Sequence, residues 1–310
     1  MNTPRRVTIV EVGPRDGFQV EPGFIPTELK IEVVDAIARA GVPKIETSSF
    51  VHPKAVPQLA DAAEVFAGID RQAGTRYSAL VPNLKGVERA RSVGADAVRL
   101  VVTSTETYNK KNVGMSVGES LEVCRRILER VDAEPIAVEA VIALAFGCPF
   151  VGPVSPDRVS ELAHRFVDMG VRELSIADSV GLGNPAAVGS LMDRLKAELP
   201  DVAFSLHLHD TRGLGLANVL AALQVGVDTF DASIGGLGGC PVFPDGAGNI
   251  ATEDLANLCA EMGIETGVDI AAVQAVSSRV QEHLGRRLPS RVLVAGTPGQ
   301  LYAKIRKESS

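Results

Sequence analysis

Short apolar runs alternate with longer amphipathic stretches along almost the whole chain. The runs are rich in β-branched residues, as buried strands are, and the longer stretches carry apolar residues at helical spacing. The pattern predicts strands at Val7–Val12, Lys44–Ser48, Arg76–Val81, Ala97–Val102, Ala137–Ala145, Glu173–Ala177, Ala203–Leu208 and Thr229–Ile234. It predicts helices at Thr27–Ala40, Ala55–Ala67, Leu84–Val93, Val117–Arg130, Pro156–Met169, Pro185–Glu198, Leu214–Val225 and Thr252–Met262.

Strict alternation of strand and helix favours an α/β fold, a (β/α)₈ TIM barrel with a C-terminal helical extension. A doubly wound open sheet is the alternative, but no Gly-rich nucleotide turn follows the first strand. No low-complexity linker interrupts the pattern, so we expect one catalytic domain over residues 1–310, with the barrel at about 5–265. In the remainder, 266–310, Val268–Leu284 predicts a helix and Leu288–Lys307 a tail that closes the barrel bottom or covers a neighbouring subunit.

Composition narrows the class of partner. The chain has 310 residues, 45% of them hydrophobic, which is enough for a large core. A formal net charge of -7 argues against nucleic acid or an anionic membrane as the main partner. No signal-type segment or membrane-spanning run is visible, and the four cysteines show no C-x-x-C spacing. We therefore expect a cytoplasmic protein with reduced thiols.

The stretch Ser205–Asp210 carries the strongest chemical signal. Alternate side chains of a strand share a face, so His207 and His209 point the same way. Two imidazoles on one face form half of a metal site, although a polar, solvated strand face is the simpler alternative. The polar segment Asp210–Gly213 at the strand tip favours the metal site, because such tips open onto active sites in barrels.

Further candidate residues fall at the carboxyl ends of the predicted strands, where barrel active sites lie. They are Arg15 and Asp16 after the first strand, Glu46 and Ser49 at the second, Asn83 after the third, Asp178 at the sixth and the loop 235–249 after the eighth. Asp16, His207, His209 and Asn249 together offer oxygen and nitrogen ligands suited to Mg²⁺, Mn²⁺, Co²⁺ or Zn²⁺. Alternatively, Asp16 caps a turn and Asn249 holds a left-handed turn position.

Three other features suggest contacts with a substrate. Arg15 places a fixed cation where an enolate oxygen could form, unless it only pairs with Glu46 or Asp178. The glycine-dense segment 235–241 is suited to close approach to a ligand or to movement as a lid, and it presents Cys240. The basic cluster Lys110-Lys111-Asn112 suits a phosphate or carboxylate, although surface lysines are usually just solvated.

Several long motifs resemble one family together. They are Glu11-Val12-Gly13-Pro14-Arg15-Asp16-Gly17-Phe18-Gln19, Glu46-Thr47-Ser48-Ser49-Phe50-Val51-His52-Pro53-Lys54, Gly147-Cys148-Pro149-Phe150, His207-Leu208-His209-Asp210-Thr211, Gly236-Leu237-Gly238-Gly239-Cys240-Pro241 and Gly248-Asn249-Ile250-Ala251-Thr252-Glu253-Asp254. In this order, and over nearly the whole chain, they resemble 3-hydroxy-3-methylglutaryl-CoA lyases. These belong to a wider group of metal-dependent TIM-barrel lyases and Claisen-type synthases.

The resemblance implies retro-aldol cleavage of 3-hydroxy-3-methylglutaryl-CoA to acetyl-CoA and acetoacetate, as in leucine degradation and ketone body metabolism. It implies a divalent cation, Mg²⁺ or Mn²⁺ with Co²⁺ or Zn²⁺ as alternatives, held by Asp16, His207, His209 and Asn249. Arg15 would stabilise the enolate, Cys240 would donate or shuttle a proton, Glu46 would assist, and Asp16 or His207 would be the base. We expect contacts to an acyl-CoA from Gln19, Ser49, Asn83, Lys111, Asn112 and Asp178, and a homo-oligomer, either a dimer or a tetramer.

The sequence also departs from the family pattern near the expected rim. Val20, Val151 and the run Val242-Phe243-Pro244-Asp245 replace more polar residues there, which leaves a lyase for another 3-hydroxyacyl-CoA as an alternative. A Claisen synthase or an aldolase acting on 2-oxo acids is a rival, as is a barrel without activity. The first motif, Gly-Pro-Arg-Asp-Gly, differs from the Thr-Leu-Arg-Asp-Gly typical of the synthases, and the intact candidate site disfavours an inactive barrel.

Overall fold

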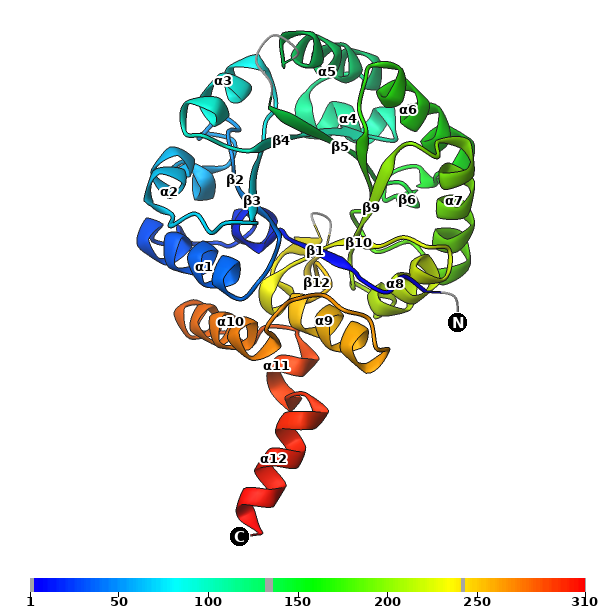
Figure 1. Cartoon of the computed structure of the whole chain (residues 1–310). Helices are drawn as coiled ribbons and strands as arrows, with labels where there is room; N and C mark the ends of the chain where they lie inside the picture. Colours follow the sequence, from blue (N-terminus) through cyan, green and yellow to red (C-terminus); the bar gives the residue numbers. More distant parts are fainter. Residues whose placement is uncertain (1–2, 132–135, 241–242, 310) are drawn as a thin grey trace.

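Eight parallel strands close into a barrel in the order β1-β10-β9-β8-β5-β4-β3-β2 (Figure 1). The computed structural model describes residues 3–131, 136–240 and 243–309, with the backbone alone at 240 and 243–246. The predicted TIM barrel is thereby confirmed. Its strands are β1 Thr8–Glu11, β2 Lys44–Ser49, β3 Arg76–Leu80, β4 Ala97–Thr103, β5 Ala137–Ala143, β8 Glu173–Asp178, β9 Ala203–Leu208 and β10 Thr229–Ala232.

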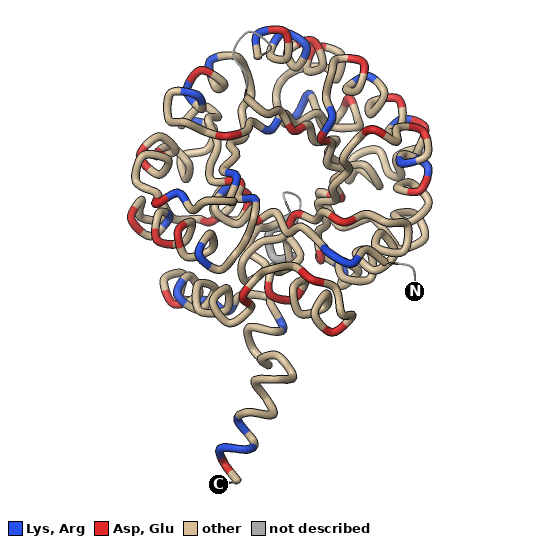
Figure 2. The backbone as a smooth tube through the Cα atoms, viewed as in Figure 1, with Lys and Arg blue, Asp and Glu red and all other residues tan. Residues whose placement is uncertain are grey.

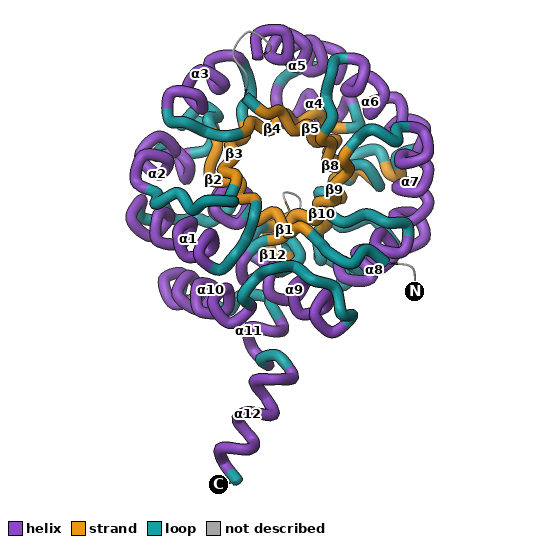
Figure 3. Tube along the Cα trace, viewed as in Figure 1, coloured by secondary structure: helices purple, strands orange, loops and turns teal. Residues whose placement is uncertain are grey.

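Helices form a ring outside the strands (Figure 3). Local sequence fixes where they start: the Asn184 side chain accepts a hydrogen bond from the Ala187 N–H, and Pro185 opens the first turn. The helices that follow the barrel strands are α1 Thr27–Arg39, α2 Ala62–Gly68, α3 Leu84–Ser92, α5 Val117–Val131, α6 Pro156–Asp168, α7 Pro185–Glu198, α8 Gly215–Gln224 and α9 Thr252–Glu261.

The strands divide their side chains between two environments. In β4, Val98, Leu100 and Val102 are buried and belong to the main hydrophobic core. Arg99 alternates with them and is also buried, at 2% exposure, but contacts other charged groups. Figure 2 shows charged residues on the strands around the barrel interior as well as on the outer helices. The apolar core therefore lies mainly between strands and helices, and polar side chains face the interior.

The prediction of one helix over Ala55–Ala67 is wrong. The chain makes a single 3₁₀ turn, η2 Pro57–Leu59, and α2 begins only at Ala62. Pro57 has no N–H to donate and restricts the residue before it, and Val56 accordingly lies outside the helical region with φ -135° and ψ 80°. The apolar spacing continues through this segment, but the backbone does not.

Several short elements that the hydrophobic pattern did not predict follow the carboxyl ends of barrel strands. They are too short or too polar to produce a periodic signal. They are the π-helical turn η1 Gly13–Gly17, α4 Glu106–Val113, the hairpin β6 Gly147–Cys148 with β7 Gly152–Pro153, the 3₁₀ turn η3 Ile234–Gly236, and the hairpin β11 Gly239–Cys240 with β12 Phe243–Ala247.

The C-terminal extension consists of α10 Ile270–Leu284, α11 Arg291–Ala295 and α12 Pro298–Glu308. The Asp254 carboxylate accepts hydrogen bonds from Ser290 Oγ and the Val292 N–H, which fastens α11 to α9. Beyond this point α12 extends away from the barrel and buries none of its residues (Figure 1). Among the described residues, no helix combines the length and apolar character needed to cross a bilayer.

Candidate metal and catalytic site

Asp16, His207 and His209 converge at the carboxyl end of the barrel. Asp16 lies in η1 directly after β1, His207 lies in β9, and His209 follows that strand. One potential ligand atom from each lies within 4.8 Å of the others. The Nε2 atoms of the two histidines are 3.1 Å apart, and His207 Nε2 is 4.0 Å from Asp16 Oδ2. The structure thus brings together three of the four predicted metal ligands around one point.

The local sequence explains how Asp16 reaches this position. Val12 O accepts hydrogen bonds from the N–H groups of Arg15, Asp16 and Gly17, and these bonds close the π-helical turn. Turns of this kind are frequent at functional sites. Gly17 is packed so closely that an added Cβ would lie 2.8 Å from the Leu237 Cβ. The loops after β1 and β10 therefore touch at a position where a larger side chain does not fit.

Asn249, the fourth predicted ligand, lies against Asp16. Its Nδ2 donates to Asp16 Oδ2 at 2.8 Å and to Leu237 O at 3.0 Å, whereas its Oδ1 is buried and has no partner among the described residues. The alternative of a left-handed Asn249 is wrong, because Leu144 is the one non-glycine residue of the described segments with positive φ. A buried oxygen without a partner is suited to a ligand that supplies the missing interaction.

The donor set fits a divalent cation. Carboxylate and amide oxygens with two imidazole nitrogens match the ligand chemistry of Mg²⁺, Mn²⁺ and Zn²⁺ sites. The two Nε2 atoms lie 3.1 Å apart, which is close enough for both to bind one ion. Asp16, His207, His209 and Asn249 would therefore hold such an ion together.

The charge state of the site also suits a cation. Burial tends to raise the pKa of Asp16, but Arg15, His207, His209 and Asn249 outweigh burial and hold this pKa at about 2. Burial and the neighbouring His207 lower the pKa of His209 to about 3. At neutral pH the site thus offers an ionised carboxylate and a neutral His209 imidazole, the forms that bind metal ions.

Arg15 is held between two carboxylates. Its Nη1 lies 2.6 Å from Asp16 Oδ1 and its Nη2 lies 2.7 Å from Glu46 Oε2, so the predicted pair with Glu46 forms. The Arg15 Nε is buried without a partner among the described residues, as is Glu46 Oε1. The guanidinium is therefore fixed in place between the two carboxylates.

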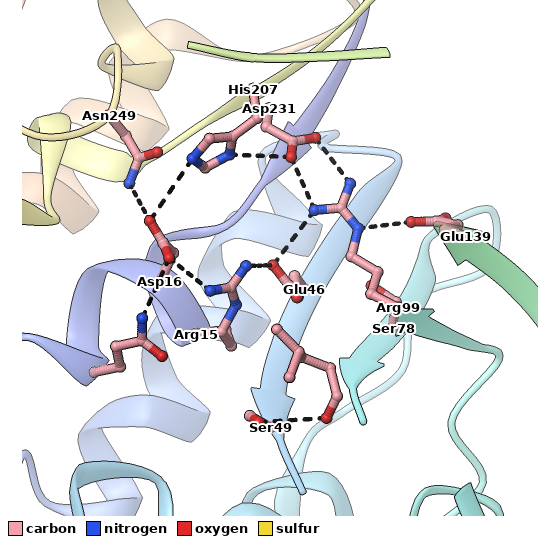
Figure 4. A network of polar contacts seen from close by, with 12 residues as sticks. Arg15, Asp16, Glu46, Ser49, Ser78, Arg99, Glu139, His207, Asp231 and Asn249 are labelled. Atoms are coloured by element: carbon pink, nitrogen blue, oxygen red, sulfur yellow. Dashed lines mark hydrogen bonds and ion pairs between the residues drawn. The ribbon is translucent and has the colours of Figure 1, made fainter. Parts of the chain in front are cut away.

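The sequence analysis did not include three charged residues that lie behind Glu46. Arg99 Nη1 lies 3.4 Å from Glu46 Oε2, and the same guanidinium binds Asp231 and Glu139 (Figure 4). All three are buried, with at most 6% of their surface exposed. A lone charge in the middle of each apolar strand, as in Ala97-Val98-Arg99-Leu100, was the signal that could have identified them.

The other predicted residues have varied partners. Gln19 Nε2 is 3.5 Å from Asp16 Oδ1, and Ser49 Oγ donates to Leu80 O. Asn83 caps α3, and Asp178 accepts N–H groups from the loop after β8 while burial raises its pKa. Lys111 and Asn112 are exposed on α4, with Lys111 Nζ 4.9 Å from the Phe150 ring centroid. The backbone of Cys240 lies in β11, but its side chain is outside the described part of the protein.

Glu11, at the end of β1, connects the two loops that form the site. Its Oε1 accepts the N–H groups of Gly13 and Ile234, at 2.8 and 2.9 Å, and its Oε2 accepts the Thr252 hydroxyl at 2.6 Å. Burial raises the Glu11 pKa to about 8 in spite of these hydrogen bonds. The folded protein therefore keeps a proton on Glu11 at neutral pH.

We expect Glu11→Gln to weaken the loss of stability with rising pH. The folded-state pKa of Glu11, about 8, exceeds the ordinary 4.5. Protonated Glu11 therefore stabilises the fold fully below pH 4.5, and this stabilisation is lost as the pH rises through 8. One such group changes the unfolding free energy by at most about 1.4 kcal/mol per pH unit. Denaturant unfolding at pH 6.5, 7.5 and 8.5 measures the slope. Glu282→Gln, at an exposed position of α10, is the control, and equal slopes in all proteins would contradict the prediction.

A family model described as HMGL-like matches residues 6–280. The chain belongs to the HMGL-like family. Hydroxymethylglutaryl-CoA lyase YngG of Bacillus subtilis, strain 168, is 42% identical over 293 residues, covering 94% of this chain and 98% of the relative. The mitochondrial hydroxymethylglutaryl-CoA lyase of Homo sapiens is 41% identical over 292 residues, covering 94% and 90%.

Solved structures of HMGL-like relatives share the architecture. The crystal structure of the Bacillus subtilis HMG-CoA lyase superposes with a TM-score of 0.93 at 40% identity, covering 98% of this chain and all of the other. The HMG-CoA lyase from Acinetobacter baumannii, solved with coenzyme A and 3-methylmalate, gives a TM-score of 0.91 at 39% identity and covers 95% and 96%. The expected resemblance to this lyase family is confirmed.

Proposed function

We propose that the protein is a metal-dependent carbon–carbon lyase that cleaves 3-hydroxy-3-methylglutaryl-CoA to acetyl-CoA and acetoacetate. The observation that supports this most is the convergence of Arg15 with Asp16, His207 and His209 on one rim, in a chain of the HMGL-like family. The names of the relatives and the coenzyme A in the Acinetobacter baumannii lyase agree with an acyl-CoA substrate.

Asp16, His207, His209 and Asn249 would hold the cation, for which we propose Mg²⁺ or Mn²⁺, with Co²⁺ or Zn²⁺ as alternatives. When bound, such a cation polarises the 3-hydroxyl of the substrate and lowers the pKa of that hydroxyl. The Arg15–Asp16–Glu46 arrangement fixes the guanidinium beside this position before any substrate arrives. Preorganised charge of this kind needs no rearrangement during the reaction.

In the proposed reaction Asp16 or His207 takes the proton of the 3-hydroxyl, which becomes the ketone of acetoacetate as the C2–C3 bond breaks. The electron pair of that bond moves into the thioester as an enolate, and a proton then converts the enolate to acetyl-CoA. Arg15 stabilises the enolate oxygen, with Glu46 keeping the guanidinium in place. We assign the proton donor to Cys240, because β11 lies in the glycine-rich loop after the barrel strand β10.

The remaining assignments concern the rest of the substrate and the assembly. Lys111 and Asn112, exposed on α4, would contact the coenzyme A moiety, and Gln19, Ser49, Asn83 and Asp178 would line the acyl end. We also propose that the chain forms one catalytic domain and that the protein is cytoplasmic. We propose a homo-oligomer as well, because α12 exposes the apolar side chains of Leu301, Tyr302 and Ile305. The free thiols of Cys124, Cys148 and Cys259 agree with a reducing compartment.

The test is an assay of metal-stripped protein reloaded with Mg²⁺ or Mn²⁺ and supplied with 3-hydroxy-3-methylglutaryl-CoA. We expect equal amounts of acetoacetate and acetyl-CoA, and loss of both when a chelator is present. Absence of cleavage by metal-loaded protein would contradict the proposal. A panel of larger 3-hydroxyacyl-CoA thioesters, and of 2-oxo acids with acetyl-CoA, would then distinguish the two alternatives.

A further inference from the structure

His207 has a second contact that the proposed reaction does not use. Asp231 in β10 is the register partner of His207 in β9, so the two side chains meet inside the barrel. The Asp231 Oδ2 lies 3.2 Å from His207 Nδ1, on the side of the ring away from Asp16 (Figure 4). Asp231 is 1% exposed and His207 7%, so water does not compete strongly for this contact.

Arg99 determines the direction of this hydrogen bond. Its Nη1 donates to Asp231 Oδ2 at 2.8 Å and its Nη2 donates to Oδ1 at 2.9 Å. A carboxylate paired in this two-pronged way is ionised and can only accept hydrogen bonds. The hydrogen atom in the contact with His207 therefore belongs to Nδ1. A neutral imidazole has one N–H, so Nε2 keeps its lone pair and faces His209 and Asp16.

The two histidines differ in this respect. The Nδ1 atom of His209 is buried and has no hydrogen-bonding partner among the described residues. Within the described segments, the one hydrogen-bonding contact of the His209 ring is with His207, whose Nε2 lies 3.1 Å from the Nε2 of His209, whereas Asp231 fixes the tautomer of His207 from the far side of its ring. Of the two imidazoles, His207 is therefore the one that a carboxylate prepares for the cation.

We propose that Asp231, held by Arg99, is a positioning residue that keeps the His207 proton on Nδ1 and presents Nε2 to the metal ion. Arg99 is itself fixed by Glu139, whose Oε2 accepts from Arg99 Nε at 2.8 Å. This inference rests on the proposed metal site for its functional consequence. The tautomer itself can be measured without any metal.

The first experiment uses the unmodified, metal-free protein labelled with ¹⁵N-histidine. The chain has five histidines, so the ring signals can be assigned with His207→Gln and His209→Gln variants. In the spectrum at pH 8 we expect the ring proton of His207 on Nδ1. A proton found mainly on His207 Nε2 would overturn the proposal.

The second experiment compares Asp231→Asn with Glu139→Gln by calorimetric titration of metal-free protein with Mn²⁺. Each variant removes one carboxylate from Arg99, but only the first replaces the group that faces His207, where the amide N–H of asparagine can donate to Nδ1 in place of a carboxylate that only accepts. We expect about 10–100-fold weaker binding by Asp231→Asn, the usual cost of losing a ligand's hydrogen-bond partner, and unchanged affinity for Glu139→Gln. Equal losses in the two variants would overturn the proposal. If the unmodified protein binds no Mn²⁺, the metal site fails instead, and the ¹⁵N spectrum still decides the tautomer.

Discussion

Replacing Arg15 by glutamine will lower kcat by about 10²–10³-fold, equivalent to about 2.7–4 kcal/mol of activation free energy. The reason is that the guanidinium is the buried cation closest to the Asp16 carboxylate, and the enolate oxygen develops its charge beside it. Glutamine cannot pair with both Asp16 and Glu46 and carries no charge. Steady-state assays at saturating Mn²⁺ measure the effect, with a much smaller change in KM than in kcat.

Arg15→Lys is the matched control for this prediction. It keeps the positive charge but loses the fork that reaches two carboxylates, so an intermediate kcat is expected. The ratio of the two variants separates the effect of charge from that of geometry. A raised KM with unchanged kcat would contradict the assignment, because Arg15 would then contribute equally to binding of substrate and transition state.

His207→Ala will weaken Mn²⁺ binding by more than the roughly 10–100-fold that follows loss of a ligand's hydrogen-bond partner. The substitution removes one of the converging ligand atoms, whereas Asp231 keeps both hydrogen bonds from Arg99. Calorimetric titration of metal-free protein measures the affinity. Thermal unfolding gives a second readout, because an ion that binds only the folded state raises Tm. We expect Mn²⁺ to raise Tm of the unmodified protein and not that of the variant.

His164→Ala provides the control for the loss of an imidazole. His164 lies on α6, with 47% of its side chain exposed, and contacts Glu198 on α7. Its removal should leave both Mn²⁺ affinity and the metal-dependent rise in Tm unchanged. Unaltered affinity in His207→Ala would show that the cation is bound elsewhere.

Residues at strand ends could be found from the sequence because the fold determines where they lie. Once eight alternating units predict a barrel, Arg15, Asp16, His207 and His209 must come together at its carboxyl rim. The length of a strand and the alternation of its side chains are local properties of the sequence. The strand ends can therefore be located without knowing which strands are neighbours, and the metal cluster was predicted from those ends.

The partners inside the barrel required information that a local pattern does not contain. Arg99 and Asp231 are 132 residues apart in the chain and meet only because the barrel closes with a particular register. The hydrogen-bond partner of a polar side chain is also not determined by the local pattern. Asn83 lies at a strand end as predicted, but its oxygen accepts the Gly86 N–H and caps a helix. A sequence pattern gives the position of such a group and not its hydrogen-bond partner.

The polar contacts around Arg15 form a row of side chains in which the sign of the charge alternates. From Asp16 through Arg15, Glu46 and Arg99 to Asp231, each group is followed by one of opposite charge, and both ends are negative. Arg99 also binds a further carboxylate, Glu139, which lies 3.5 Å from Arg76, so the alternation continues into the barrel. At the other end the row stops at the Asp16 carboxylate, and a cation held there would add the next positive charge.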